Sequence, residues 1–492
     1  MKNKMFKLCL CLPVVCLCFA MSFSTVMAAE PVFTGGCELI TGSTSYNTTA
    51  GTRTPQPYYT LEYDFLGAGV MPLGGWAGPY SPTYDTVNGI LYPDYVTDEY
   101  YGLISDSGIN FINSSLDTYA NNPEAVKKAL ELGVRHGVGS FVEDPYIKSV
   151  KDKDLMAQRL ANYYSYESCL GVHIVDEPSA PAFDGIKEIF DVYRSIDKLD
   201  TSGRHFYANL FPSYAGTALG VAGSNYETYC RQFMQKVAPA FLSYDNYPFN
   251  RINQGTNVGS AFFNDLATAR KVAAEFKVPY WTFVQAGGQW ESHMGQPSDP
   301  LHPNEGETLW NINTALAFGA KGIQYFTVIQ AAAFTQAYND VDFTRNGMIG
   351  AAGNLNQWYY YIQKANKQIA AASPVLMRSA SMGIVGSNPL VGSTVYKSIS
   401  SGGNTGAMKL GTSWRELKTF SASNAIAGCF DYMGRSAFFV VNCSTTAKQD
   451  ITLQFDKKYG FDVTQRARTV SVAGQNLTLR LENGEGVLVV LR

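Results

Sequence analysis

Short apolar runs alternate with longer amphipathic stretches through the middle of the chain. The runs begin roughly 28 to 44 residues apart, which leaves room for one strand, one helix and two loops in each repeat. Eight such repeats are the number that a closed (β/α)8 barrel requires. The predicted strands are Leu66–Met71, Asn110–Asn113, Val138–Val142, Leu170–Val175, His205–Leu210, Phe241–Tyr244, Tyr280–Val284 and Gly322–Thr327.

The stretches between these runs have the periodicity of helices. One of them starts with Asn122, Pro123 and Glu124, which supply a capping side chain, a proline for the first helical position and an acid for the first turn. Similar stripes of apolar residues occupy 155–164, 186–196, 261–276, 305–318 and 355–371. Ser373-Pro374 predicts the end of the last helix and of the barrel, which we place at 66–374.

The last part of the chain, 375–492, has a different pattern. It is rich in Gly, Ser and Thr and contains short alternating runs without a convincing helix, which predicts a small all-β antiparallel sandwich. The predicted strands there are Ala437–Val441, Asp450–Phe455, Thr469–Val472, Leu477–Leu481 and Gly486–Leu491. The fold class predicted for the whole chain is therefore α/β, a (β/α)8 TIM barrel followed by this sandwich.

The first 29 residues have the pattern of a secretory signal peptide. Three lysines, Lys2, Lys4 and Lys7, precede an apolar run from Leu8 to about Phe23, and small residues end the segment at Ala28 or Ala29. The run is shorter than the ~20 residues that a membrane span needs, so we expect it to be cleaved. We expect residues 30–65, which show no clear periodicity, to be a leader that packs on the barrel. The mature protein is then secreted or extracytoplasmic, with no membrane span.

Composition narrows the possible partners. Without the three signal-peptide lysines, the chain of 492 residues keeps 35 basic and 41 acidic residues, which gives no reason to expect nucleic acid as a partner. Aromatic residues make up 13% of the chain, which suits stacking against sugar rings but also suits large aromatic cores. The cysteines outside the signal are scattered, and the five histidines show no HxH or HExxH spacing. We therefore predict neither a metal site nor a cofactor.

The strand that ends in Val175-Asp176-Glu177-Pro178 is the main candidate for chemistry. Strict alternation places Leu170, Val172, Ile174 and Asp176 on the helix side and Gly171, His173, Val175 and Glu177 inside the barrel. Glu177 then lies at the carboxyl end of its strand, where active sites of such barrels occur. Asp176, by contrast, is expected to bond to the backbone beside Pro178.

Other strands end in polar or aromatic side chains that alternation directs to the same mouth. A pocket of carboxylates, amides and aromatic rings suits glycosidic bond cleavage, in which one carboxylic acid protonates the leaving oxygen and a second carboxylate attacks the sugar or activates water. The predicted ligand is an oligosaccharide or polysaccharide. The residues expected to bind it are Trp76, His173, Asn209, Tyr247, Trp281, Gln285 and Trp290.

Several short passages make the chain similar to secreted (β/α)8 glycoside hydrolases of the clan A type. They are VMPLGGWAGPY near the start, IVDEP in the fourth strand, SYDNYPF in the sixth, and WTFVQ with ALAFGAKGIQYFT in the last two. The resemblance covers roughly 60–375 and implies a C-terminal β-domain like the one predicted here. It also implies that Glu177 is the acid/base and that the nucleophile lies at the end of strand seven.

At that second position the chain departs from the family pattern, because strand seven ends in Gln285, which cannot act as a carboxylate nucleophile. Asp245 is the leading candidate for the second carboxylate, and Glu291 and Glu143 are alternatives. Glu143 could instead raise the pKa of Glu177 and keep it protonated. The favoured hypothesis is a secreted glycosidase. The alternative that Gln285 suggests is a carbohydrate-binding barrel without catalytic activity.

Overall fold

A computed structural model describes residues 66, 69–85, 90–113, 117, 121–196, 204–249, 260–287, 303–330, 347–387 and 413–492. The predicted signal peptide 1–29, the leader 30–65, Trp290 and Glu291 lie outside these residues. Across the described residues, no helix has the length and apolar character required to cross a membrane.

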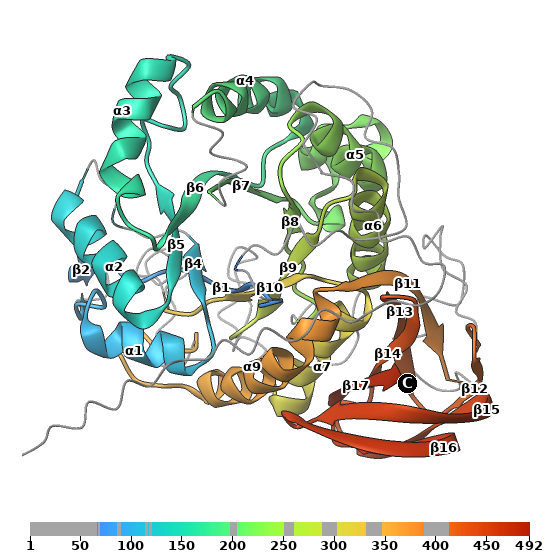
Figure 1. The fold of residues 1–492 in the computed structure, drawn as a ribbon. Helices are drawn as coiled ribbons and strands as arrows, with labels where there is room; N and C mark the ends of the chain where they lie inside the picture. The colour runs from blue at the N-terminus through green and yellow to red at the C-terminus, as the bar shows by residue number, and fades with distance from the viewer. Residues whose placement is uncertain are drawn as a thin grey trace, which may run out of the picture. The chain divides into compact units, whose positions relative to one another are not determined.

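Eight parallel strands close into a barrel with helices around it (Figure 1), as the repeat predicts. Each strand pairs with its neighbours in sequence, and β10 closes the ring against β1. Since the strands are parallel, all their carboxyl ends meet at one mouth. The strands are β1 (Leu73–Trp76), β4 (Phe111–Asn113), β5 (Gly139–Glu143), β6 (Cys169–Asp176), β7 (His205–Leu210), β8 (Leu242–Tyr244), β9 (Tyr280–Gln285) and β10 (Gly322–Phe326).

The first strand is the one strand of the barrel that the sequence misplaced. It is Leu73–Trp76 rather than Leu66–Met71, and its two glycines made it look like a loop. Both glycines are needed for packing: a Cβ on Gly74 would lie 2.1 Å from the Phe111 ring, and one on Gly75 would lie 2.2 Å from Val328. Along this short strand the backbone lies close to neighbouring side chains, and a hydrophobicity pattern does not reveal such a contact.

Several helices begin at a side chain that caps their first turn. Asn122 caps α2 by accepting a hydrogen bond from the Ala125 N–H, and Asn304 and Glu307 form a capping box at the start of α7. The helices are α1 (Asp98–Asp106), α2 (Pro123–His136), α3 (Lys153–Tyr164), α4 (Phe183–Arg194), α5 (Tyr226–Lys236), α6 (Ser260–Phe276), α7 (Glu305–Ala317) and α9 (Gln357–Leu376). α9 continues past Pro374, where the sequence predicted its end.

The C-terminal part is all-β and antiparallel, as predicted. Its strands follow the order β11-β13-β14-β17-β15-β12, and β16 pairs with β15. Thr469–Val472 and Leu477–Leu481, predicted as two strands, belong to the single strand β16. The strands are β11 (Ser379–Gly386), β12 (Leu417–Ser421), β13 (Ala425–Tyr432), β14 (Arg435–Asn442), β15 (Gln449–Gln465), β16 (Arg468–Leu481) and β17 (Gly486–Leu491).

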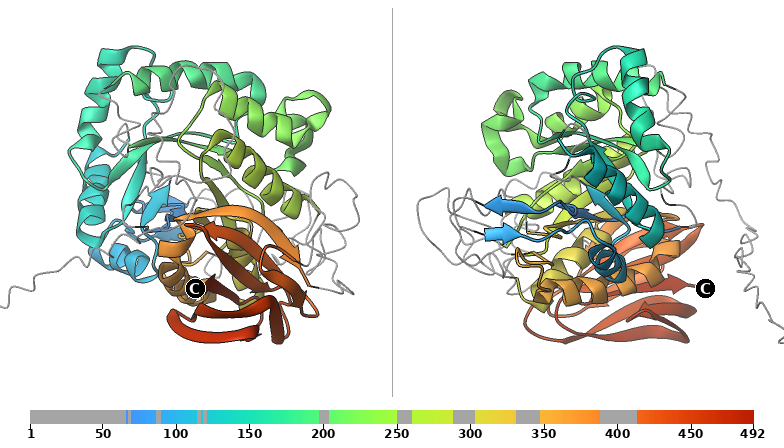
Figure 2. Two further views of the ribbon diagram at one scale, coloured as in Figure 1. Left: turned by 45° about the vertical axis from the view of Figure 1, so that its right-hand side comes forward. Right: turned by 90° about the vertical axis from the view of Figure 1, so that its left-hand side faces the viewer.

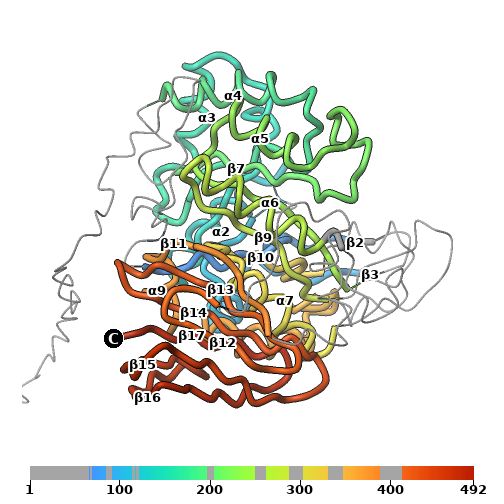
Figure 3. Tube along the Cα trace, turned by 90° about the vertical axis from the view of Figure 1, so that its right-hand side faces the viewer, coloured from blue at the N-terminus to red at the C-terminus, as the bar shows by residue number. Residues whose placement is uncertain are grey.

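This sheet packs beside the barrel helix α7 (Figures 2 and 3), whose residues are buried along its length. Asn313 of α7 donates a hydrogen bond to the Gly484 carbonyl at 2.9 Å. Lys321, at the start of β10, donates to the carbonyls of Leu376 and Ser379. The junction therefore lies away from the mouth, next to the amino-terminal end of β10.

Inside the barrel, the amino-terminal ends of the strands carry an aromatic layer. Trp281 stacks on Phe241 with ring centroids 3.8 Å apart and an angle of 10° between the planes. Phe111, Phe141 and Tyr207 pack around this pair, and all five side chains are buried. This layer, here called the aromatic floor, fills the barrel below the polar mouth.

Candidate active site

Two β-bulges in β6 decide which side chains reach the mouth. Against β5, Cys169 pairs with Ser140 while Gly171 pairs with Phe141; against β7, His173 pairs with Tyr207 while Val175 pairs with Ala208. Each irregularity inserts one extra residue and interrupts strict alternation. As a result Leu170 packs on the aromatic floor, Val175 packs outside, and Asp176 faces the polar groups of the mouth. The predicted facing of these three residues was wrong for this reason.

Asp176 and Asp245 meet at one amide group. The Nδ2 atom of Asn209 donates to Asp176 Oδ1 at 3.2 Å and to Asp245 Oδ1 at 3.1 Å. Asn209 and Asp245 are buried, whereas the Asp176 side chain is exposed at the mouth. Asp176 is therefore part of the site, bonded to a side chain rather than to backbone beside Pro178.

Glu177 is held in an uncommon backbone conformation. Its φ is +48°, in the left-handed region that non-glycine residues seldom adopt. Its N–H donates to the Asn209 carbonyl at 2.8 Å, and the carbonyl of the next residue, Pro178, accepts from the Tyr229 hydroxyl at 2.6 Å. These two bonds hold the turn at the carboxyl end of β6 and so direct the Glu177 side chain.

All three carboxyl groups have raised pKa values. Burial, and then the charge of Asp176, raises the pKa of Glu177 to about 7. Burial raises the pKa of Asp245 well above its ordinary value, with further increases from the charges of Glu177 and Asp176. The pKa of Asp176 is raised too, mainly by loss of solvation, but water at its open face screens this effect. Near neutral pH the group therefore keeps at least one proton.

A buried polar network supports Asn209 from below. Its Oδ1 atom accepts from the Ser243 hydroxyl at 3.0 Å, so its NH₂ group must face the carboxyls. The Gln324 Nε2 atom donates to the same Ser243 oxygen at 3.0 Å, and the Tyr207 hydroxyl donates to Gln324 Oε1 at 2.9 Å. The network connects β7, β8 and β10, and ties the amide of the mouth to the aromatic floor.

Glu143, an alternative second carboxylate, ends β5 in an ion pair with Lys148. Its Oε1 atom lies 4.0 Å from Nδ1 of His173. The charge of Glu143 contributes to the raised pKa of Asp176, whereas the shift of Glu177 comes from burial and Asp176. Glu143 was predicted to raise the pKa of Glu177, but it raises the pKa of Asp176 instead.

His173 and Trp76 form one wall of the site. Their rings meet edge to face with centroids 5.1 Å apart, and the His173 side chain is only 2% exposed. Burial lowers the pKa of His173 to about 4, so the ring is neutral at neutral pH. Because the ring is buried, it supports Trp76 instead of presenting its nitrogens at the mouth, where the sequence predicted a substrate contact.

Gln285 bonds to the loop that follows β8. Its Nε2 atom donates to the Phe249 carbonyl at 2.6 Å, and its Oε1 atom accepts from the Phe249 N–H at 2.7 Å. Both ends of the amide are thus engaged by the backbone of the loop after β8, and the side chain is only 1% exposed. The residue at the end of strand seven holds this loop.

Two aromatic residues predicted to bind substrate lie in different places. Tyr247, in the loop after β8, is partly exposed and its ring lies 5.3 Å from that of Phe326. Trp281 lies at the other end of its strand, in the aromatic floor, and is 1% exposed. We therefore leave Trp281 out of the site, because strand alternation predicts a face but not a depth.

Sequence reasoning missed two residues of the site, Asp176 and Tyr214. Gly171 was the available signal for Asp176, since a glycine inside a strand often marks a bulge; its φ is +137°, and a Cβ there would lie 1.9 Å from the His205 carbonyl oxygen. Tyr214, in the loop after β7, is 57% exposed. The pKa of Tyr214 is raised by loss of solvation, which its exposure reduces, and by the charges of Asp245 and Glu177, so this residue is coupled electrostatically to the carboxyls.

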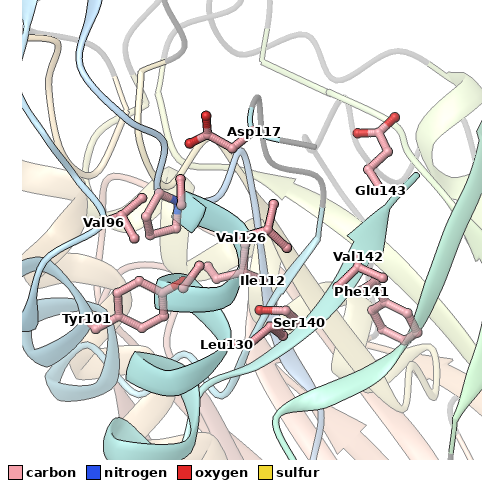
Figure 4. Close-up of a pocket in the computed structure, with 13 residues that line it drawn as sticks. Val96, Tyr101, Ile112, Asp117, Val126, Leu130, Ser140, Phe141, Val142 and Glu143 are labelled. Carbon is pink, nitrogen blue, oxygen red and sulfur yellow. The ribbon is translucent and has the colours of Figure 1, made fainter. Parts of the chain in front are cut away.

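A small cavity lies elsewhere, between α2 and strands β4 and β5 (Figure 4). Val126 and Leu130 of α2 face Ile112 and Ser140 across it, and Glu143 lies at its edge. Its volume of about 30 Å³ accommodates about one or two water molecules, far less than the ~300 Å³ of ordinary ligand pockets. This cavity is therefore too small to bind a sugar.

Within the described part of the chain, no three His, Cys, Asp or Glu side chains form a group that could hold a metal ion. Asp176, Glu177 and Asp245 are bound instead to amide groups or coupled through charge. What they can do chemically is transfer protons and stabilise positive charge.

Comparison with known proteins finds likeness in structure only. No protein-family model and no curated protein sequence matches the chain. Solved structures that match it include several glycoside hydrolases. One is a β-galactosidase from the psychrophilic Marinomonas ef1, with 12% identity, a TM-score of 0.42 and 62% of each chain covered. A second is a β-galactosidase from the Antarctic haloarchaeon Halorubrum lacusprofundi, with 12% identity, a TM-score of 0.43 and 61% of this chain and 58% of that chain covered.

A third is an arabinofuranosidase from Xanthomonas axonopodis pv. citri, with 9% identity, a TM-score of 0.43 and 87% of this chain and 97% of that chain covered. The chain spans less than two thirds of the length of the two β-galactosidases that it matches. The parallel barrel and the antiparallel C-terminal sheet are established by the strand pairing of this chain itself.

Proposed function

We propose that the protein hydrolyses O-glycosidic bonds, with Glu177 as the general acid. The observation that carries this proposal is the group of Asp176, Glu177 and Asp245 at the mouth of the barrel, which keeps a proton near neutral pH. Cleavage of a glycosidic bond needs a protonated carboxyl beside an ionised one, and environments that separate their pKa values assign the two roles.

Asp245 is the proposed second carboxylate. It belongs to the loop after β8, whereas Glu177 ends β6, so the two approach the mouth from different strands. After burial, the charge of Glu177 is the next cause of the raised pKa of Asp245, because two negative charges in a buried site repel. A protonated carboxyl beside an ionised one is therefore favoured over two ionised ones. One member protonates the leaving oxygen and the other attacks the sugar or activates water.

Asp176 has a supporting role in this proposal. It adjoins Glu177 on the same strand and shares the Asn209 amide with Asp245. Its charge helps to keep Glu177 protonated. Reaction at the anomeric carbon calls for carboxyls on separate sides of the sugar, which two adjacent residues at one strand end supply less well than residues from two strands.

The aromatic and amide groups around the carboxyls suit a saccharide. Trp76 and Tyr247 offer partly exposed rings for the C–H faces of a sugar. The buried His173 ring supports the Trp76 ring from the side. We propose an oligosaccharide or polysaccharide substrate, an exported protein and no nucleic-acid partner. Trp290 and Glu291 stay candidates from the sequence.

The test is reducing-sugar release from a panel of plant, microbial and host glycans by wild type, Glu177→Gln and Asp245→Asn. We expect each variant to lose about 10² or more of the wild-type rate, since each lacks one of the two reacting carboxyls. Glu124→Gln, the same chemical change on the exposed face of α2, is the matched control and should keep full activity. Unchanged hydrolysis by Glu177→Gln would refute the assignment.

Gln285 favours one other function, a barrel that binds glycans without cleaving them. Both amide atoms of this residue are tied to Phe249, so the end of β9 supplies no carboxylate. If wild type releases no sugar from the panel while wild type and Glu177→Gln bind the same glycan, the binding function is the correct one. Repeated turnover by wild type would exclude it.

A further inference from the structure

The loop after β7 is anchored at two points by side chains from the outer helices. The Phe211 N–H donates to the hydroxyl of Tyr229, on α5, at 3.3 Å. The Ser213 N–H donates to Oδ2 of Asp265, on α6, at 3.0 Å. Both helix side chains are fully buried. The start of this loop is therefore attached to the helix layer rather than to the barrel mouth alone.

The same two side chains also hold the residues that follow the proposed reacting carboxyls. The Tyr229 hydroxyl donates to the carbonyl of Pro178, which follows Glu177, at 2.6 Å. Asn246, which follows Asp245, donates its Nδ2 to Asp265 Oδ2 at 2.6 Å. Each anchor thus joins the loop after β7 to the residue next to a carboxylate.

We infer that Tyr229 and Asp265 are positioning residues that set the relative placement of Glu177 and Asp245 through the loop after β7. The inference rests on the proposed function, because it concerns the geometry of that reaction. Neither residue touches the reacting atoms. Each acts by holding backbone or side-chain groups one residue away from a carboxyl.

The need for such anchors follows from local geometry. Glu177 keeps a left-handed backbone conformation that a non-glycine residue adopts only when its surroundings impose it. Without the Tyr229 hydroxyl, the Pro178 carbonyl and the Phe211 N–H would both lose a hydrogen-bond partner in a buried region. The turn that carries Glu177 would then relax toward solvent, and a displacement of about 1 Å in a catalytic group can cost about 10² in rate.

Tyr229→Phe tests this inference, because it removes the hydroxyl and keeps the ring. Tyr226→Phe is the matched control: Tyr226 is buried on the same helix one turn earlier, and its hydroxyl reaches neither loop among the described residues. The main measurement is the titration of Glu177 by NMR of ¹³C-labelled glutamate side chains in the free protein. Its signal is assigned by its absence in Glu177→Gln, and no substrate is required.

In Tyr229→Phe we expect the Glu177 titration midpoint to fall by about 0.5 pH unit or more toward its ordinary value, because the carboxyl gains solvent. It should stay unchanged in Tyr226→Phe. With a cleaved glycan, kcat should fall about tenfold in Tyr229→Phe and in Asp265→Asn, while KM stays within about twofold. A rise in KM alone would contradict a positioning role.

The two proposals fail in different ways. Equal Glu177 midpoints in wild type, Tyr229→Phe and Tyr226→Phe would overturn the inference even if Glu177→Gln is inactive. A shifted midpoint in Tyr229→Phe, together with full hydrolysis by Glu177→Gln, would sustain the anchor and refute the role of Glu177 as the acid. Thermal unfolding of each variant distinguishes a local change from general loss of the fold.

Discussion

The aromatic floor and the polar mouth are built from the same strands but serve opposite purposes. At the floor, Trp281 and Phe241 stack face to face and are buried. At the mouth, the continuation of these strands brings in Asn209 and Asp245, two polar groups that burial makes costly. One barrel thus contains a layer that stabilises the fold and a layer that destabilises it.

The difference between these layers shows how a barrel can support a strained, charged site. The mouth contains a non-glycine residue with positive φ and three carboxyls that repel one another. The floor offsets these costs through apolar burial, and the chain of Tyr207, Gln324 and Ser243 connects the two layers by hydrogen bonds. A change in one layer should therefore affect stability and chemistry in different proportions.

The largest effect on stability should come from Trp281→Ala in the floor. The side chain is 1% exposed and stacks on Phe241, so its removal leaves a cavity that costs about 3–5 kcal/mol. Catalysis per folded molecule should stay within about threefold, since the residue lies below the reacting groups. Urea unfolding measures the first quantity, and kcat corrected for the folded fraction measures the second.

Tyr360→Ala is the control for this substitution. Tyr360 is also a large aromatic residue, but it is 55% exposed on α9, and its removal should cost less than about 1 kcal/mol. A loss of kcat by 10² in Trp281→Ala at full folding would show that floor and mouth are not separable. It would also return Trp281 to the list of substrate-binding candidates.

A smaller effect is expected from Gln285→Glu at the mouth. The new carboxylate could still accept from the Phe249 N–H, but it would lose the donor that now reaches the Phe249 carbonyl. We expect a loss of about 1–3 kcal/mol in the free energy of unfolding and no gain in hydrolysis. Gln158→Glu, the same change on an exposed position of α3, should leave stability nearly unchanged. Increased turnover in Gln285→Glu would mean that this position can supply a nucleophile.

The sequence predicted the barrel well because strand and helix signals there are local. Seven of the eight strands lie where apolar runs indicate, and the cap of α2 forms on Asn122 as expected. The exception is β1, where Gly74 and Gly75 are set by contacts with distant residues. Helix α9 likewise continues through Pro374, a position at which a local signal predicts a stop.

The candidate site was predicted less completely, because its geometry depends on pairing between strands. Alternation along β6 assigns Asp176 to the outside, and only the register against β5 and β7 reveals the bulges that turn it inward. Contacts such as Gln285 with Phe249 join segments far apart in the chain. Residue types therefore identified the chemistry of the mouth, whereas its arrangement required the folded chain.

The last prediction concerns the pH dependence of kcat and of the free energy of unfolding, which depends on the mouth and not on the aromatic floor. Glu177 must carry a proton to act as an acid, and burial raises its pKa to about 7, so kcat should decline above pH ~7 by about tenfold per pH unit.

The same raised pKa means that the folded state binds more protons than the unfolded state between Glu177's ordinary pKa and 7, so stability should fall as pH rises through that window. Glu177→Gln should reduce this slope, and the raised pKa values of the buried Asp245 and Asp265 should leave part of it in place. Trp281→Ala should lower stability at every pH and keep the slope and the activity limb in place, because the floor side chain carries no titrating group. Measuring unfolding and kcat across pH 4–9 for both variants checks each statement, and a shifted activity limb in Trp281→Ala would show that the floor sets the electrostatics of the mouth.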